Sequence, residues 1–209
     1  MRLEERDYKI LNVVYRFRFC LGRHIKSLAG YGSLRATDRR LKILVEAGFL
    51  ERKKYIFGIP YLYTLSHKGR MLINVNKRAE QIRLDRITHD IHVLDTAIYF
   101  LEKYNISLEN ITTEKELHSL DGFGLRKRYP DFIINHNGEQ KAVEIELTAK
   151  NKITFGNNVK TNYLNYDSQI WVTNNSSVRN SLEKLKNSYS NIVVLNLGEI
   201  LNYGRDIFV

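Results

Sequence analysis

The sequence predicts a two-domain protein of mixed α+β and α/β structure, in which a helical domain with a β-hairpin precedes a mixed sheet flanked by helices. The 209 residues suffice for one large domain or two small ones. Their hydrophobic content of 43% can fill a core. Charge is uneven, because residues 1–86 contain 20 Lys and Arg against 8 Asp and Glu, whereas residues 87–209 contain 13 against 15. A compact basic region attracts a polyanion, most often nucleic acid, and the alternative is a solvated basic surface.

Composition excludes several classes of protein. Cys20 is the only cysteine, so one chain forms neither a disulfide framework nor a Cys-rich zinc site. A reducing compartment suits such a chain, and we expect a cytoplasmic protein. No apolar run approaches the roughly 18 residues of a membrane-spanning helix, and the charged first residues are unlike a signal peptide. We therefore expect no membrane partner.

Three helices are predicted first. Residues 4–19 form an amphipathic pattern with apolar residues at helical spacing, namely Ile10, Leu11, Val14 and Phe17. A short helix over 21–30 follows and ends at Gly30. Ser33 is then the expected N-cap of a third helix, which ends near Gly48.

The third helix has two chemically different faces. At about 100° per residue, its inward face is expected to consist of Leu34, Thr37, Leu41, Leu44 and Val45. Basic residues occupy the other side, namely Arg35, Arg39, Arg40 and Lys42. A strand, a turn around Gly58 and a second strand are expected over 49–66, and "SHKGRMLI" then opens a short helix.

Three helices followed by a basic β-hairpin resemble the winged helix-turn-helix, and the resemblance covers roughly residues 5–75, within an expected domain of 1–76. It implies double-stranded DNA as the partner and places the basic face of the third helix in the major groove. It also implies that the hairpin residues Arg52, Lys53 and Lys54 contact phosphates or the minor groove. A winged helix used only for protein contacts is the alternative.

Residues 77–104 are expected to form one long helix, or two joined near Asp85, with 77–86 as a linker helix. A seam of apolar residues suits a core or a homodimer interface, and consists of Ile87, Ile91, Leu94, Ile98 and Leu101. His89 and His92 flank Asp90, but without a third ligand nearby a role in helix packing is favoured over metal binding.

The stretch "YPDFIINHNGEQKAVEIEL", residues 129–147, contains three acids in two otherwise apolar strands. Asn137-Gly138 predicts a two-residue hairpin turn, because both residues tolerate positive φ. Paired residue numbers then add up to 275, which places Asp131 opposite Glu144 on one face. Side chains alternate along a strand, so Glu146 points to the same face and three carboxylates are expected to converge.

Facing carboxylates destabilise a sheet unless something offsets their charge. Mg²⁺ or Mn²⁺ would do so, because hard cations prefer carboxylate and carbonyl oxygens. A raised pKa of one acid is a second solution. A salt-bridge network is the third, since basic residues lie just upstream at 126–128 and just downstream at Lys150.

Pro130-Asp131 followed by Glu144-x-Glu146 resembles the PD-(D/E)XK nuclease pattern, and the expected element order fits it over residues 87 to about 197, within a domain of 87–209. That order includes a strand over 111–118, helices near 158–165 and 177–187, and strands at "QIWVTN" and "NIVVLNL". The resemblance implies a catalytic set of Asp131, Glu144, Glu146 and Lys150, with Asp131 and Glu144 as metal ligands. Glu146 stands where the family usually has Lys, and Lys150 is the candidate replacement.

The whole chain resembles the replication-relaxation family of plasmids and integrated mobile elements, through "YPDFII…VEIELT" and the downstream "KTNYLNY". The resemblance implies an accessory role in replication or conjugative mobilisation, with a relaxase or replication initiator as a candidate partner. We expect a sequence-specific double-stranded DNA-binding protein. The alternatives are a Mg²⁺-dependent DNA endonuclease or nickase, a transcriptional regulator with a dimerisation domain, and an RNA-binding module that stacks bases on its tyrosines.

Overall fold

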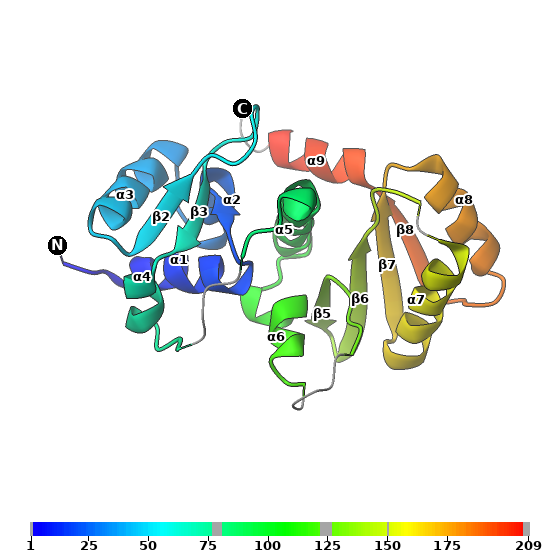
Figure 1. Cartoon of the computed structure of the whole chain (residues 1–209). Helices are drawn as coiled ribbons and strands as arrows, with labels where there is room; N and C mark the ends of the chain where they lie inside the picture. The colour runs from blue at the N-terminus through cyan, green and yellow to red at the C-terminus, as the bar shows by residue number, and fades with distance from the viewer. Residues whose placement is uncertain (1, 77–80, 122–126, 150, 207–209) are drawn as a thin grey trace. The chain divides into compact units, whose positions relative to one another are not determined.

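The computed structural model describes residues 2–76, 81–121, 127–149 and 151–206. The chain divides into two compact units, Met1–Leu94 and Asp95–Val209, called here the N-terminal and C-terminal units. The division falls inside helix α5 (Ile87–Tyr104) and not within the expected linker over 77–86. The expected mixture of helices and strands is confirmed, with a three-stranded sheet in the first unit and a five-stranded mixed sheet in the second (Figure 1).

The N-terminal unit alternates helices with short strands. Its elements before α5 are α1 (Glu5–Arg16), β1 (Cys20–Leu21), α2 (Gly22–Leu28), α3 (Leu34–Glu46), β2 (Leu50–Lys53), β3 (Leu62–Leu65), α4 (His67–Leu72) and the 3₁₀ helix η1 (Leu84–Arg86). The strands pair antiparallel in the order β1-β3-β2. The three helices and the hairpin are where the sequence predicts them, and the two-residue strand β1 was not expected.

Local hydrogen bonds account for the start of α3. The Ala36 amide donates to Ser33 Oγ at 3.2 Å, which confirms the expected N-cap. The inward face is largely as predicted, because Thr37, Leu41 and Leu44 are buried. Val45 is half-buried, and Leu34 is 42% exposed, since it is the first residue of the helix and lies at the end of the packed stripe.

The C-terminal unit builds its sheet in the order β4-β5-β6-β7-β8. Its elements after α5 are the 3₁₀ helix η2 (Leu108–Asn110), β4 (Ile111–Thr113), α6 (Glu114–His118), β5 (Phe132–His136), β6 (Glu139–Ile145), α7 (Lys152–Asn165), β7 (Ser168–Thr173), α8 (Ser176–Leu185), β8 (Ile192–Asn196) and α9 (Leu197–Asp206). The β4–β5 and β5–β6 pairs are antiparallel, whereas β6–β7 and β7–β8 are parallel. The sheet is therefore mixed, as predicted.

The β5–β6 hairpin has the predicted register. Asn137 and Gly138 have φ of 53° and 80°, which is the backbone that a two-residue primed turn requires. Phe132 pairs with Val143 and His136 with Glu139, so paired residue numbers add up to 275. The recorded pairing ends at Phe132 and Val143, and one further step of the same register would place Asp131 opposite Glu144.

The strand expected over 111–118 is wrong beyond Thr113. There Thr113 Oγ1 accepts a hydrogen bond from the Glu116 amide at 3.3 Å, and the Thr113 amide donates to Glu116 Oε2 at 2.8 Å. This reciprocal capping box starts the helix α6 directly after β4. Local capping therefore outweighs the strand-like pattern of the segment.

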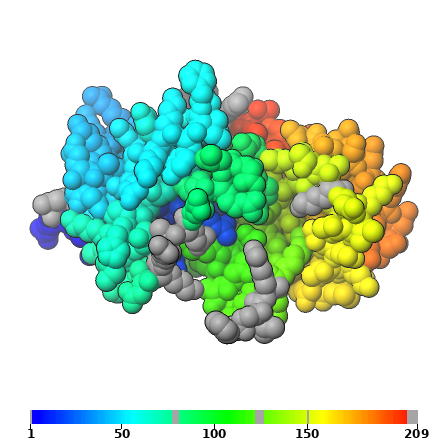
Figure 2. Space-filling view, viewed as in Figure 1, coloured from blue at the N-terminus to red at the C-terminus, as the bar shows by residue number. Residues whose placement is uncertain are grey.

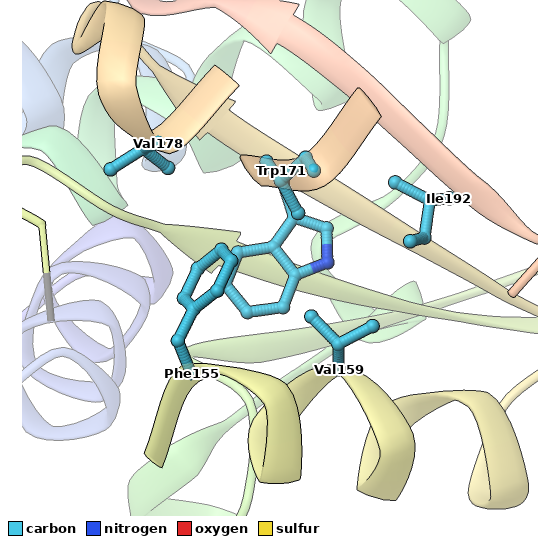
Figure 3. Packing of buried hydrophobic residues seen from close by; sticks show 6 residues of the cluster. Phe155, Val159, Trp171, Val178 and Ile192 are labelled. Atoms are coloured by element: carbon cyan, nitrogen blue, oxygen red, sulfur yellow. The ribbon is translucent and has the colours of Figure 1, made fainter. Parts of the chain in front are cut away.

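A tryptophan forms the centre of one core of the C-terminal unit. Trp171 of β7 is fully buried and packs among apolar side chains of α7, α8 and β8, namely Phe155, Val159, Val178, Leu182 and Ile192 (Figure 3). Its indole N–H donates to Gln169 Oε1 at 2.9 Å, which satisfies the one polar group of the ring. Trp171 is the direct β-sheet partner of Glu144, so this acid lies next to the core.

Candidate functional sites

The basic residues of α3 form an exposed stripe. Arg35, Arg39 and Lys42 are exposed and follow one another at i, i+4 and i+7, so they share one side of the helix. Lys42 Nζ lies 3.7 Å from Glu46 Oε1, but both side chains are exposed and such a pair contributes little stability. The stripe thus presents three cations on the face opposite to the buried Thr37, Leu41 and Leu44.

Arg40, which the sequence assigns to the same basic face, has a different environment. Its Nε donates to Asp7 Oδ1 at 2.6 Å, and its Nη2 donates both to Asp7 Oδ2 and, at 3.1 Å, to the Arg2 carbonyl oxygen. The Arg40 side chain is only 15% exposed, and Asp7 is buried. The guanidinium thus links α3 to α1, and we leave Arg40 out of the exposed stripe.

The pKa of Asp7 reflects this pairing. Burial alone would raise it, but the hydrogen bonds from Arg40 and from the Glu4 amide, together with the Arg40 charge, outweigh burial and hold the pKa of Asp7 below its ordinary value. Asp7 therefore stays ionised at neutral pH, and the pair has a structural role.

The hairpin between β2 and β3 carries a second group of exposed cations. Arg52, Lys53 and Lys54 are all exposed. Arg52 Cζ lies 4.5 Å from the centre of the Tyr61 ring, and Lys53 Nζ lies 3.4 Å from Glu51 Oε2. The cations are thus held on the hairpin by weak surface contacts that a stronger anionic partner can replace.

Asp131, which lies just before β5, and Glu144 of β6 each accept a hydrogen bond from another part of the protein. Asp131 Oδ2 accepts a hydrogen bond from the Ile145 amide at 2.8 Å, so this carboxylate turns onto the backbone of β6. Glu144 is buried; its Oε1 accepts from Asn162 Nδ2 at 2.9 Å and forms an ion pair with Arg128. Glu146 is also buried, and its amide donates to the Val172 carbonyl oxygen at 2.9 Å, which extends the β6–β7 pairing.

The protein partners of Asp131 and Glu144 compete with a divalent cation for these two carboxylates. The positive charge next to Glu144 is already supplied by Arg128, and Asp131 is committed to a backbone amide. Across the described parts of the chain, no three His, Cys, Asp or Glu side chains lie close enough together to hold a metal ion. Lys150, the predicted substitute for the family's Lys, lies outside the described residues. The geometry therefore favours the salt-bridge alternative for Glu144.

Sequence reasoning missed Asn162 as part of this site. Asn162 is fully buried on α7, accepts from Arg128 Nη1 at 2.7 Å and donates to Glu144. The sequence contains a pattern that could have identified Asn162. Phe155, Val159 and Asn162 follow one another at i, i+4 and i+7, so they share one face of the helix. A polar residue that continues a buried apolar stripe indicates a buried hydrogen-bonding partner.

Tyr166 completes the surroundings of the Arg128–Glu144 pair. Burial is the main cause that raises the pKa of Tyr166; the Arg128 charge lowers it and the Glu144 charge raises it. The phenol is therefore protonated at neutral pH and available as a hydrogen-bond donor. Together the pair and the polar groups around it are called the Glu144 cluster, which consists of Arg128, Glu144, Asn162 and Tyr166.

A second polar group lies at the end of α6. Asp121 Oδ1 accepts from the Tyr129 hydroxyl at 2.6 Å, and Asp121 Oδ2 lies 2.9 Å from His118 Nδ1. These bonds from Tyr129 and then His118 lower the pKa of Asp121. On α5, His89 Nδ1 lies 3.1 Å from Asp90 Oδ1, and both side chains are half-buried.

Comparison of the chain with family models, with curated proteins and with solved structures finds no match. None of the helices within the described residues is both long and apolar enough to cross a lipid bilayer.

Proposed function

We propose that the protein binds double-stranded DNA through its N-terminal unit, which we interpret as a winged helix. The element order α1-β1-α2-α3-β2-β3 and the antiparallel order β1-β3-β2 support this interpretation. The observation that carries the proposal is the exposed stripe of Arg35, Arg39 and Lys42 on α3. This stripe lies within residues 1–86, which have an excess of 12 positive charges.

In this proposal α3 enters the major groove and the hairpin contacts the backbone. Arginines on α3 can donate two parallel hydrogen bonds to guanine, which supplies sequence choice. Arg52, Lys53 and Lys54 neutralise phosphates, and each neutralised phosphate changes the slope of log affinity against log salt by about −0.9. Binding is therefore expected to weaken steeply as salt increases.

We further propose that the C-terminal unit has a PD-(D/E)XK-like fold that acts as a platform and not as a metal-dependent nuclease. The order α5-β4-β5-β6-α7-β7-α8-β8, with the hairpin before the two parallel strands, supports the fold. The Arg128–Glu144 ion pair supports a platform that does not cleave DNA, because a guanidinium already neutralises the acid that would bind a cation. The resemblance to the replication-relaxation family points to an accessory role in replication or mobilisation of a plasmid or integrated element, as a homodimer with a relaxase or initiator as partner.

A metal-dependent DNA endonuclease or nickase is the second candidate, because one step beyond the Phe132–Val143 pair the same register would bring Asp131 opposite Glu144. Supercoiled plasmid that carries the gene's own upstream region distinguishes the two candidates. The protein is incubated with it in Mg²⁺ or Mn²⁺, beside the variant Asp131→Ala. We expect uncut plasmid with both proteins, whereas nicking that the variant lacks would establish the nuclease.

DNA binding itself is tested by gel shift on a fragment of the upstream region. The combined variant Arg35→Ala, Arg39→Ala and Lys42→Ala is expected to lose at least tenfold in affinity, since each base or phosphate contact contributes about 1 kcal/mol or more. Lys9→Ala is the matched control, because it removes an exposed cation of α1 that is paired with Glu5. Equal binding by the triple variant, with an unchanged circular dichroism spectrum, would contradict the proposal.

A further inference from the structure

Phe57 is the most exposed of the large hydrophobic side chains that the structure describes. It is 96% exposed and lies in the loop between β2 and β3. Burying such a side chain would contribute about 2 kcal/mol, so leaving the ring in water costs stability that a binding partner can recover. The loop extends beyond the ends of β2 and β3 in Figure 1, and its cyan side chains project from the surface of their unit in Figure 2.

A tight turn places Phe57 at the tip of this loop. The Ile59 amide donates to the Ile56 carbonyl oxygen at 3.3 Å, which closes a four-residue turn. Gly58, the third residue of the turn, has φ of 83°, a conformation that favours glycine and is typical of a type II turn. Phe57 is the second residue, whose side chain points away from the closed ring of the turn.

The surroundings of the ring are positively charged. Lys54 Nζ lies 5.6 Å from the centre of the Phe57 ring, within the range of a cation–π contact. Arg52 and Lys53 precede it on the same hairpin and are exposed. An exposed phenyl ring next to three cations complements DNA, in which phosphates border an apolar stack of bases.

We propose that Phe57 inserts between two base pairs from the minor groove, as a wedge that unstacks the step and unwinds the duplex. Apolar side chains at the tips of DNA-binding elements partly unstack base steps in this way, and the adjacent cations hold the phosphates on both sides. The inference rests on the proposed DNA binding and adds a deformation of the DNA to it. Flexible pyrimidine–purine steps such as TA are the expected positions of insertion, because they unstack at the lowest cost.

Unwinding is measured without knowledge of a target site. Relaxed closed-circular plasmid is incubated with the protein at low salt, treated with topoisomerase I and then freed of protein. Insertion leaves the plasmid with a reduced linking number. Phe57→Ala is compared with wild type at equal occupancy, as judged by gel shift, and is expected to leave the linking number unchanged while binding about tenfold more weakly. Phe57→Leu keeps an apolar wedge and is expected to retain most of the unwinding.

Ile153→Ala is the matched control, because Ile153 is a highly exposed apolar residue of α7 in the other unit, and its removal is expected to change neither result. Equal linking-number changes with wild type and Phe57→Ala would overturn the wedge and leave DNA binding intact. A wild-type protein that binds without any change in linking number would overturn it as well. A wild-type protein that fails to shift duplex DNA would instead remove the proposed function, and the wedge with it.

Discussion

Each unit contains a buried carboxylate paired with an arginine, and the two pairs differ in what surrounds them. In the N-terminal unit, Arg40 and the Glu4 amide satisfy Asp7, and the pair links α3 to α1. In the C-terminal unit, Arg128 pairs with Glu144 in a group that also holds the buried Asn162. Arg40 Nη1 also lies 3.4 Å from Oε1 of the exposed Glu4, so the N-terminal arginine meets one buried and one exposed acid, whereas Arg128 shares its buried acid with a buried amide.

Accessibility separates the two pairs further. The Arg40 side chain is 15% exposed and the Arg128 side chain is 31% exposed. Desolvation strengthens an ion pair only if its remaining hydrogen-bonding groups are satisfied, and removal of one partner then leaves a buried charge. The more enclosed pair is therefore expected to contribute more to stability, and the more open pair to respond more to added ions.

The largest expected effect is on the N-terminal pair. Arg40→Ala leaves the buried Asp7 carboxylate without its counter-charge and is expected to lower the free energy of unfolding by about 3 kcal/mol, measured by urea denaturation. Arg39→Ala, one residue away on the exposed stripe, is expected to change stability by less than about 0.5 kcal/mol and to weaken DNA binding instead. If both variants lost stability equally, the distinction between the stripe and the pair would be wrong.

Arg128→Ala is expected to lower the free energy of unfolding by about 2 kcal/mol, because Glu144 keeps its bond from Asn162 but loses the positive charge. Without the guanidinium, the Glu144 carboxylate should attract a cation, so Mn²⁺ is expected to raise the melting temperature of this variant and leave that of wild type unchanged. A similar Mn²⁺-dependent rise in wild type would indicate that the Glu144 cluster holds a cation with Arg128 in place.

Asn162→Ala has a smaller expected effect, since Arg128 and Glu144 still pair when the amide is removed. The lost bonds to both partners are expected to cost about 1–2 kcal/mol in thermal or urea unfolding. Asn165→Ala, at an exposed position of the same helix, is the control and should change stability by no more than about 0.5 kcal/mol. An Asn162 variant as stable as this control would contradict the hydrogen-bonded role of Asn162.

The smallest expected effect is on the pH dependence of stability, through the Asp7 carboxylate. The pKa of Asp7 is lower in the folded protein than in the unfolded chain, so the unfolded state takes up its proton first as pH falls. The stability from this pair is full above the ordinary Asp pKa of about 3.9 and is lost as pH decreases through the folded-state pKa. The urea concentration at the unfolding midpoint of wild type is expected to be lower in this pH range than near neutral pH. Asp7→Asn should have a flatter profile there, and parallel profiles would contradict the coupling.

Much of the hairpin and of α3 could be predicted from the sequence, because the interactions that determine them are local. Asn137-Gly138 selects a turn by its tolerance of positive φ, and the turn then determines the register. Ser33 forms its cap with Ala36, three residues away. The wrong prediction beyond Thr113 also concerns a local interaction. The capping box between Thr113 and Glu116 could be found in the sequence, but the prediction followed the apparent strand pattern instead.

The sequence by itself determined the local backbone, the distribution of charge and the register of the β5–β6 hairpin. Only the tertiary structure decided which arginine meets which acid, as in Arg40 with Asp7, 33 residues apart, and Arg128 with Glu144, 16 residues apart. Turn and cap preferences act between neighbours in the chain, whereas an ion pair forms where packing brings two distant groups together and excludes water from both.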